Sequence, residues 1–461
     1  MRYCYLILVG LVAMPAALGR QKPSGWVDTG TVVRLKNVND SVGLGTTDVT
    51  SKLTVGGTIE SKFGGFVFPD GTVQTTAALY VQDPSGGQGA STSSGTVLDV
   101  TAYGAIGDGL HDDTGAFMLA LSTLSEHGGG ELYVPRGVYS LSARLNIANS
   151  ITLAGDGLQA SKLVWMNGDG GVRVIGGNAL WDNRTVVHVH DLSFLTSVPQ
   201  GGTALLLDYD LPVGAIQSFA NIERVEFSGI QGGYWSIGVH HHNVRGTTIR
   251  QCDFKGSVTS SSPFAPGAKG ILIDGPNHQV DHFIESSRFW FLDRCVDIGG
   301  ATEGVVINGV QAVGINCGVR VETDGGCPGV VVTNSHFDIW SVALDLVTAT
   351  DSTVTNNLIY TRVNPPGTLA GVFIRGKCKD VHVAGNIFHG HGADFNGVVV
   401  VGPADEVTVA LNKFAGCSTA VWLKNTSGCM VLDNDFDSSG ANVLMQPPSS
   451  ANFVRKMPWD N

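Results

Sequence analysis

Three aspartates near the middle of the chain could support acid–base chemistry. Asp274 and Asp297 lie on equivalent strands of two successive sequence repeats, offset by two residues, and Asp293 is in the same segment as Asp297. If the repeats stack, the carboxylates of Asp274 and Asp297 are roughly 8 Å apart, from a rise of ~4.8 Å and a shift of ~6.6 Å. Inverting glycosidases use such a separation because a water molecule fits between acid and base. Like charges at this distance raise the pKa of one carboxyl group, as a general acid requires.

Cationic and aromatic side chains of the same repeats are candidates for substrate contacts. Arg294 or Arg320 could hold the carboxylate of a uronic acid through paired hydrogen bonds. The remaining members of the expected substrate-binding set are Glu322, His240, Trp235 and Trp290. We expect at least one ring to be buried among the four that precede these strands, which are Tyr234, Trp235, Trp290 and Phe291. The alternative to a functional site is a solvated face whose carboxylates only discourage association with other molecules.

The run His240-His241-His242 contains three metal-ligating side chains but does not predict a metal site. Strand alternation directs His241 to the opposite side from its two neighbours, so the three rings cannot converge. We therefore expect no metal site and no cofactor, with calcium as the exception if the reaction is that of a lyase.

One sequence pattern recurs from about Gly246 to Gln446 and must position these side chains. Each copy has an apolar alternation, an Asn or Ser, an Ile or Phe, a turn and a second apolar alternation. A period of about 22 to 29 residues with two-residue alternation predicts short strands that coil into a parallel β-helix. The Asn positions are expected to form an inward ladder that satisfies backbone groups at the turns; they are Asn357, Asn386, Asn412 and Asn434.

The second strand of each repeat can be divided into an inward and an outward face. Its first and third residues are apolar, so the second and fourth point outward. The outward positions, in chain order, are Asp208, His240, Asp274, Asp297, Arg320, Glu322, Asp345, Phe373, Arg375, Trp422 and Lys424. This face is rich in carboxylates in the middle, and aromatic and basic in the last repeats. Chemistry is expected on it because side chains fill the inside.

A helix is predicted over residues 113–126, at the start of the repeats. Phe117, Leu121 and Leu124 follow helical spacing, and Asp112 is placed to cap the first turn by accepting an amide proton near Gly115. The helix would cover the open strand edges at this end. We interpret the aspartates at this end, Asp108, Asp112 and Asp113, as structural and not as catalytic.

The segments 99–114 and 128–139 resemble the opening of the pectate-lyase-like superfamily, in the branch of rhamnogalacturonases and tail-spike depolymerases. The resemblance implies an all-β fold, a right-handed single-stranded parallel β-helix with a short capping helix. Asp293 matches the first Asp of the Asp-Asp-Cys-Ile-Ala-Ile segment of the polygalacturonase family, but Arg294 replaces the second. The reaction of that family is therefore not implied.

The chain before the repeats is expected to contain three different segments. Residues 1–19 have the positive start, apolar run and small-residue cleavage site of a signal peptide. Residues 20–83 are predicted to form a small β-rich stalk, because the segment 68–77 resembles modules of phage tail fibres, which are trimeric in that family. Residues 84–95 are a Gly/Ser linker by composition, residues 96–446 the β-helix and residues 447–461 a C-terminal tail.

Two classes of function remain. The first is a secreted polysaccharide hydrolase or lyase that acts in a groove on the outer face. The second is a non-catalytic carbohydrate-binding or spike-like surface protein that uses the same groove. A net charge of −12 argues against a nucleic-acid partner, and no stretch after the signal peptide is apolar and long enough to span a membrane. The expected partners are a polysaccharide and, through the stalk, two further copies of the chain.

Overall fold

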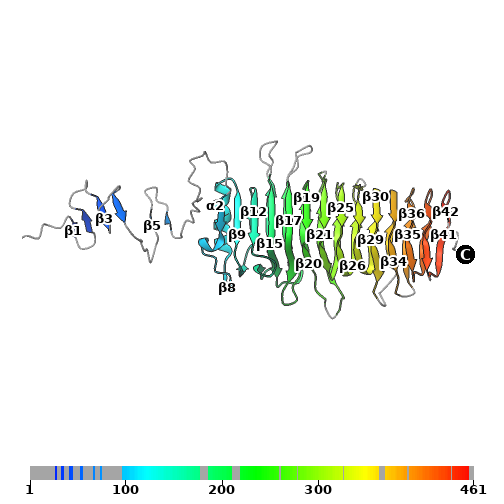
Figure 1. Cartoon of the computed structure of the whole chain (residues 1–461), viewed down its shortest axis with the longest axis horizontal. Helices are drawn as coiled ribbons and strands as arrows, with labels where there is room; N and C mark the ends of the chain where they lie inside the picture. Colours follow the sequence, from blue (N-terminus) through cyan, green and yellow to red (C-terminus); the bar gives the residue numbers. More distant parts are fainter. Residues whose placement is uncertain are drawn as a thin grey trace, which may run out of the picture. The chain divides into compact units, whose positions relative to one another are not determined.

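The computed structural model divides the chain into two compact units, residues 1–77 and 78–461 (Figure 1). Most of the second unit is described, namely residues 96–455 apart from 177–184, 210–218, 259–260, 278, 325–326, 363–368, 392–393 and 438. The described parts of the first unit are residues 26–28, 33–35, 41–44, 52–55, 66–67 and 73–74. The predicted signal peptide and Gly/Ser linker lie outside the described residues.

The described residues of the first unit form three short strand pairs. β1 (Trp26–Asp28) pairs antiparallel with β2 (Val33–Leu35), β3 (Val42–Leu44) parallel with β4 (Leu53–Val55), and β5 (Phe66–Val67) antiparallel with β6 (Val73–Gln74). The described residues of this segment are mostly in strands, whereas the extent of the stalk stays a prediction. Trimerisation through it stays a prediction.

The second unit is a parallel β-helix in which each coil contributes a strand to three sheets in turn. Sheet 1 contains β7 (Val97–Asp99), β9 (Gly130–Val134), β12 (Ile151–Gly155), the first parts of β15 (Val187–Thr196) and β17 (Ala220–Gly229), β19 (Thr247–Arg250), β22 (His282–Glu285), β25 (Val305–Asn308), β27 (Cys327–Pro328), β28 (Val331–Thr333), β30 (Ala349–Thr355), β33 (Lys379–Ala384), β36 (Thr408–Ala410), β39 (Met430–Leu432) and β42 (Phe453–Arg455).

Sheet 2 follows sheet 1 in each coil. It contains β8 (Asp108–Asp112), β10 (Gly137–Leu141), β13 (Ser161–Trp165), the last parts of β15 and β17, β20 (Asp253–Lys255), β23 (Arg288–Trp290), the first parts of β26 (Gln311–Val321) and β29 (His336–Leu346), β31 (Leu358–Thr361), β34 (Ile387–His389), β37 (Lys413–Ala415) and β40 (Asp435–Asp437).

Sheet 3 closes each coil. It contains β11 (Leu145–Ile147), β14 (Val172–Gly176), β16 (Thr203–Tyr209), β18 (Ile237–His242), β21 (Ala265–Asp274), β24 (Leu292–Ile298), the last parts of β26 and β29, β32 (Leu369–Ile374), β35 (Phe395–Val401), β38 (Thr419–Lys424) and β41 (Ala441–Gln446). The solenoid continues past the boundary expected at Gln446, because β42 pairs with β39 in sheet 1.

Two ladders of stacked side chains run through the core. The backbone N–H groups of Asn357, Asn386 and Asn412 each donate to the side-chain Oδ1 of the next Asn at 2.9 Å, so the predicted inward ladder is confirmed. A second ladder stacks phenylalanine rings, with centroids 4.9 Å apart for Phe227–Phe254 and for Phe254–Phe289. Each ladder repeats one side chain at one position of several successive coils, which helps to fix the register of those coils.

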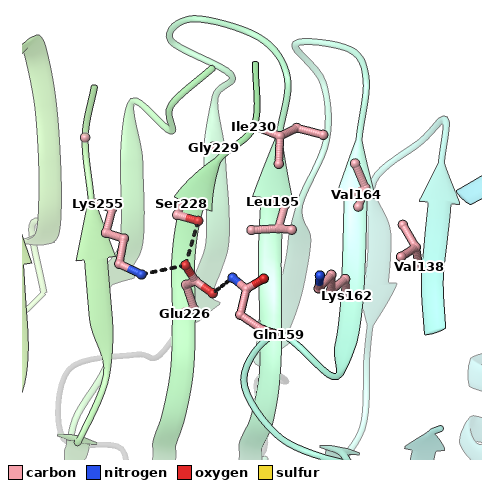
Figure 2. A pocket seen from close by; sticks show the side chains of 11 residues that line it. Val138, Gln159, Lys162, Val164, Leu195, Glu226, Ser228, Gly229, Ile230 and Lys255 are labelled. Carbon is pink, nitrogen blue, oxygen red and sulfur yellow. Dashed lines mark hydrogen bonds and ion pairs between the residues drawn. The ribbon is translucent and has the colours of Figure 1, made fainter. Parts of the chain in front are cut away.

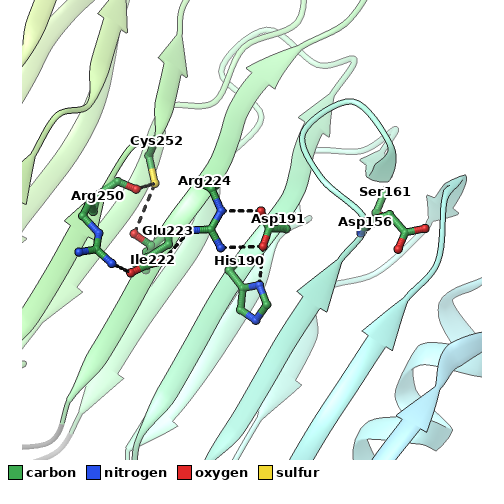
Figure 3. A network of polar contacts seen from close by, with 9 residues as sticks. All are labelled: Asp156, Ser161, His190, Asp191, Ile222, Glu223, Arg224, Arg250 and Cys252. Carbon is green, nitrogen blue, oxygen red and sulfur yellow. Dashed lines mark hydrogen bonds and ion pairs between the residues drawn. The ribbon is translucent and has the colours of Figure 1, made fainter.

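Ion pairs join the coils at the corner between sheets 1 and 2 (Figure 3). Asp191 and Arg224 occupy equivalent corner positions with φ of 58° and 49°, a left-handed conformation that turns the chain sharply. Arg224 Nε and Nη2 donate to the two carboxylate oxygens of Asp191 at 2.6 and 2.8 Å. Glu223 accepts from Arg224 at 2.8 Å and also from Arg250 of the following coil. The charged side chains of this corner therefore neutralise one another.

The N-terminal end of the solenoid carries the predicted helix. A single 3-10 turn, η1 (Val100–Tyr103), precedes it, and α2 (Thr114–Glu126) starts one residue later than expected. The N-cap residue of α2 is Asp113, whose side chain makes no capping hydrogen bond. Asp112, one residue earlier, accepts from the backbone N–H of Thr114 at 3.0 Å, so it binds a first-turn amide but not from the expected cap position or near Gly115. Phe117 and Leu124 are fully buried against the first coil. In the described part of the chain, no helix has the length and apolarity needed to cross a bilayer.

Asp112→Ala is expected to destabilise α2 by roughly 1 kcal/mol, because the substitution removes the acceptor of a first-turn amide. Hydrogen exchange of α2 amides should therefore accelerate by about fivefold, relative to the parent chain. Asp169→Ala, at an exposed turn position, is the control and should leave α2 exchange unchanged. Equal exchange in α2 for the parent and Asp112→Ala would contradict this role of Asp112.

Candidate functional site

The outer face of sheet 3 carries the side chains that were expected to point outward. One column runs from His240 past Leu272 to Asp297, Arg320 and Asp345 on successive coils. The neighbouring column contains Asp208, His242 and Asp274. The two-residue offset between Asp274 and Asp297 is therefore confirmed.

Alignment of the sequence repeats places His240 level with Asp208 and Asp274, and this register of β18 is wrong by two residues. His242, and not His240, pairs with Asp208 and Asp274 on the adjacent coils. A slip of two residues keeps the same side of a strand facing inward, so apolar alternation alone cannot detect it. His241 does point inward, as expected, and is fully buried.

Asp274 lies between the two outward histidines of the preceding coil. Its Oδ1 is 2.8 Å from His240 Nε2 and 3.0 Å from His242 Nδ1. Burial disfavours the ionised carboxylate, but the hydrogen bonds from both histidines outweigh it and lower the pKa of Asp274 to about 2. The expectation that carboxylate repulsion would raise a pKa is wrong for Asp274, because imidazoles and not another carboxylate are its nearest partners.

Asp297 is directed outward but is covered by two cations. Lys269 Nζ and Arg294 Nη1 each lie 2.7 Å from its Oδ2, and the residue is only 7% exposed. Arg294, which was expected to bind substrate charge, therefore has an internal partner. Arg320 stands beside Asp297 in the register, as expected, yet its ion pairs are with Glu322 and with Asp345, the latter at 3.7 Å.

Asp293 and Trp290 lie at the corner where sheet 2 passes into sheet 3. Trp290 is the last residue of β23 and is partly exposed. Asp293 is the second residue of β24, and its Oδ1 accepts from Asn316 Nδ2 of the next coil at 2.8 Å. The structure thus brings these two residues to one edge of the face that carries Asp274 and Asp297.

Trp235 is a core residue, which corrects its prediction as a substrate contact. It is 3% exposed, its indole N–H donates to the carbonyl oxygen of Phe194 at 3.1 Å, and its ring meets Trp165 edge-on at 5.8 Å. Tyr234 is also buried, at 6%. The turn before β18 folds into the solenoid, so rings next to a strand start need not reach solvent.

A pocket of about 470 Å³ lies on the sheet 3 face in the last coils. Phe373 and Trp422 line it from the same outward column, with Val399 between them. Lys424 supplies positive charge, whereas the Arg375 guanidinium lies 5.5 Å from the Phe373 ring centroid and donates to both carboxylate oxygens of Asp345, another lining residue, at 2.9 Å. Its outward composition was visible in the sequence, but no spacing signal marked these residues as a site.

A second pocket, of about 500 Å³, lies on sheet 2 near the N-terminal end (Figure 2). Glu226 is 2% exposed there and accepts hydrogen bonds from Lys255 at 2.8 Å, from Ser228 at 3.0 Å and from Gln159. Burial acts to raise the pKa of Glu226, but the Lys255 ammonium and the hydrogen bonds lower it below its ordinary value. Because this carboxylate is held ionised by its own neighbours, we regard it as part of the fold.

Comparisons with known proteins identify the fold. Residues 97–318 match the family described as rhamnogalacturonase A/epimerase, pectate lyase-like. A curated relative, plasmin and fibronectin-binding protein A of Streptococcus pneumoniae (strain ATCC BAA-255 / R6), is 27% identical over 198 residues, which are 39% of this chain. The match spans only about a quarter (23%) of that protein's length.

Two solved structures share the solenoid. The A-module of the Azotobacter vinelandii mannuronan C-5 epimerase AlgE6 has a TM-score of 0.56 and 19% identity over 78% of this chain and 100% of that module. A double mutant of the tailspike protein of E. coli bacteriophage HK620 has a TM-score of 0.55 and 14% identity over 74% of this chain and 66% of the tailspike. Residues 97–318 of this chain are thus similar to the pectate-lyase-like family, and the solved structures show that its fold is a parallel β-helix.

Proposed function

We propose that this protein is an extracellular polysaccharide-binding protein whose ligand lies along the outer face of sheet 3. The observation that carries the proposal is the pocket lined by Phe373, Trp422, Arg375 and Lys424. Residues 1–19 direct export and residues 20–83 hold three copies together in this proposal.

The pocket combines the two kinds of contact that an acidic sugar needs. The rings of Phe373 and Trp422 offer apolar faces to sugar C–H groups, and burying such surface contributes ~25 cal/mol per Å². Lys424 offers a cation to uronate carboxylates, whereas the guanidinium of Arg375 is already paired with Asp345. Because the whole chain has a net charge of −12, a polyanion requires such a local positive region. The names of the relatives support an extracellular ligand, since they include an enzyme acting on mannuronan and a phage tailspike.

The second candidate function is cleavage of the same polysaccharide as a hydrolase or lyase. It is favoured by the charged cluster in which Lys269 and Arg294 flank Asp297, one coil from Asp274 and on the same strand as Asp293. In this reading the aspartates supply acid and base, Arg320, Glu322, His240 and Trp290 contact sugar, and calcium is required only for a lyase. Binding in the pocket lined by Phe373 and Trp422, the aromatic pocket, would then position the polysaccharide for reaction at the charged cluster.

Trp422→Ala is expected to weaken polysaccharide binding by at least about tenfold, equivalent to ~1.4 kcal/mol. The indole N–H of Trp422 has no hydrogen-bond partner among the described residues, so truncation removes ring contact without breaking a hydrogen bond. Affinity should be measured by calorimetry against a panel of acidic and neutral polysaccharides. Phe283→Ala is the control, because Phe283 is an aromatic residue 40% exposed on sheet 1.

The outcomes separate the two candidates. Binding to an acidic polysaccharide that is lost in Trp422→Ala and kept in Phe283→Ala supports the proposed face. New reducing ends, or the absorbance of unsaturated uronates, would instead establish a hydrolase or a lyase. Equal binding by the parent and Trp422→Ala would show that the ligand does not bind in this pocket.

A further inference from the structure

We propose that His240, His242 and Asp274 form a binding site for a divalent transition-metal ion of the zinc class. The site lies on the outer face of sheet 3 and spans two coils, with both histidines on β18 and the carboxylate on β21. This inference does not rest on polysaccharide binding, because the aromatic pocket is built from later coils.

The strand geometry brings three ligand atoms together. His240 and His242 are two residues apart and so project from the same side of β18, while Asp274 is the register partner of His242. One ring nitrogen from each histidine and one carboxylate oxygen all lie within 4.8 Å of one another. The two imidazoles thus face the carboxylate without any rearrangement of the backbone.

The observed distances are close to those of a metal centre. Zinc binds imidazole nitrogen and carboxylate oxygen at ~2.0–2.2 Å, so ligand atoms of a tetrahedral site are about 3.4 Å apart. The Asp274 Oδ1 atom lies 2.8 Å from His240 Nε2 and 3.0 Å from His242 Nδ1. Admitting the ion would therefore require each of these two separations to lengthen by about half an ångström. Two imidazoles and one carboxylate are a donor set that suits zinc and related transition ions better than calcium.

The surroundings leave the ion accessible and its ligands uncontested. The side chains of His240, His242 and Asp274 are 18%, 37% and 36% exposed, so water can complete the coordination. Gly299, on the next coil, has no side chain to cover Asp274, and a Cβ there would be 3.9 Å from that of Asp274. Two cations of the same face are engaged elsewhere, since Arg173 binds Asp208 and Lys269 binds Asp297.

A similar group elsewhere in the solenoid provides a control. His188 and His190 are also two residues apart on one strand, with ring centroids 4.4 Å apart, and His190 Nδ1 lies 2.8 Å from Asp191. Both oxygens of Asp191, however, accept from Arg224. A bound guanidinium competes with a metal ion for the carboxylate, so this second pair of histidines should not bind one.

The test is calorimetric titration of the full chain with Zn²⁺ after treatment with a chelator. We expect one ion per chain at this site, with binding weakened at least about tenfold in His242→Ala and in Asp274→Asn, or ~1.4 kcal/mol each. His190→Ala should bind as the parent does. Titration with Co²⁺ gives a second readout, because its visible absorption reports coordination by imidazole. Circular dichroism of each variant checks that it is folded.

The results that would overturn the proposal are distinct. Failure of the folded parent to bind Zn²⁺ and Co²⁺ would reduce the cluster to a hydrogen-bonded triad. Binding that is unchanged in both His242→Ala and Asp274→Asn, or that is weakened equally in His190→Ala, would place the ion elsewhere on the surface. Loss of metal binding with polysaccharide binding retained would leave the two proposals separate, as the structure implies.

Discussion

Asn412→Ala is expected to lower the free energy of unfolding by about 2–5 kcal/mol, because each buried polar group left without a partner costs ~1–3 kcal/mol. Asn412 is 1% exposed. Its Oδ1 accepts from the backbone and side-chain nitrogens of Asn386, both at 2.9 Å. Its Nδ2 donates to the carbonyl oxygen of Val383 at 2.9 Å and to Asn434 at 3.0 Å. Alanine removes all four hydrogen bonds and admits no water to replace them.

Urea titration, with hydrogen exchange of β34 and β37, would measure this effect. Asn146→Ala is the matched control, since Asn146 is exposed on β11 and its loss should change stability by no more than about 0.5 kcal/mol. If the two variants unfold at the same urea concentration, the Asn ladder does not stabilise the solenoid.

Asp293→Asn is expected to slow turnover by ~10²–10⁴ on any polysaccharide that the protein cleaves, the usual cost of losing one acid–base group. Among the described residues, the hydrogen-bond partner found for Asp293 is the neutral amide of Asn316, so the substitution removes a charge without stranding a cation. Asp297→Asn is a poorer test of catalysis than the position of Asp297 in the sequence repeats suggests. It would leave Lys269 and Arg294 without their shared carboxylate and so lose stability as well as charge.

Initial rates from reducing-end assays on the folded variants would measure the effect. Asp112→Asn is the control, because its carboxylate binds a first-turn amide of α2 and should not affect turnover. Full activity in Asp274→Asn, Asp293→Asn and Asp297→Asn, together with its loss in Asp112→Asn, would place the reaction at the N-terminal end of the solenoid instead.

The sequence predicted those features of the solenoid that depend on local alternation. The inward Asn positions, the helix over residues 114–126 and the outward direction of Asp274 and Asp297 all follow from periods of two and 3.6. The ion pairs did not follow, because partners such as Lys269 and Asp297 meet only after the chain has passed through a coil of unpredictable length. The burial of Trp235 depended on the path of a turn, which alternation does not describe.

The candidate site was predicted in part for the same reason. The sequence identified which side of the sheet 3 strands faces outward, and it named the aspartates on that side. It missed the grouping of His242 with Asp274, because a slip of two residues preserves the apolar pattern. It also did not select Trp422 and Phe373, whose pairing on one side of a pocket exists only after three coils have stacked.

The corners between the three sheets have a consequence for how such a chain can diverge. Each coil is held by the coils before and after it, so a corner can gain or lose residues while the strands keep their partners. Selection can therefore remodel the corners almost independently of the ladders that fix the register. Sequence identities of only 14% to 19% with proteins of the same fold are expected if the corners change freely and only the ladders are constrained. Lineages that share the scaffold are then free to acquire unrelated ligands one corner at a time.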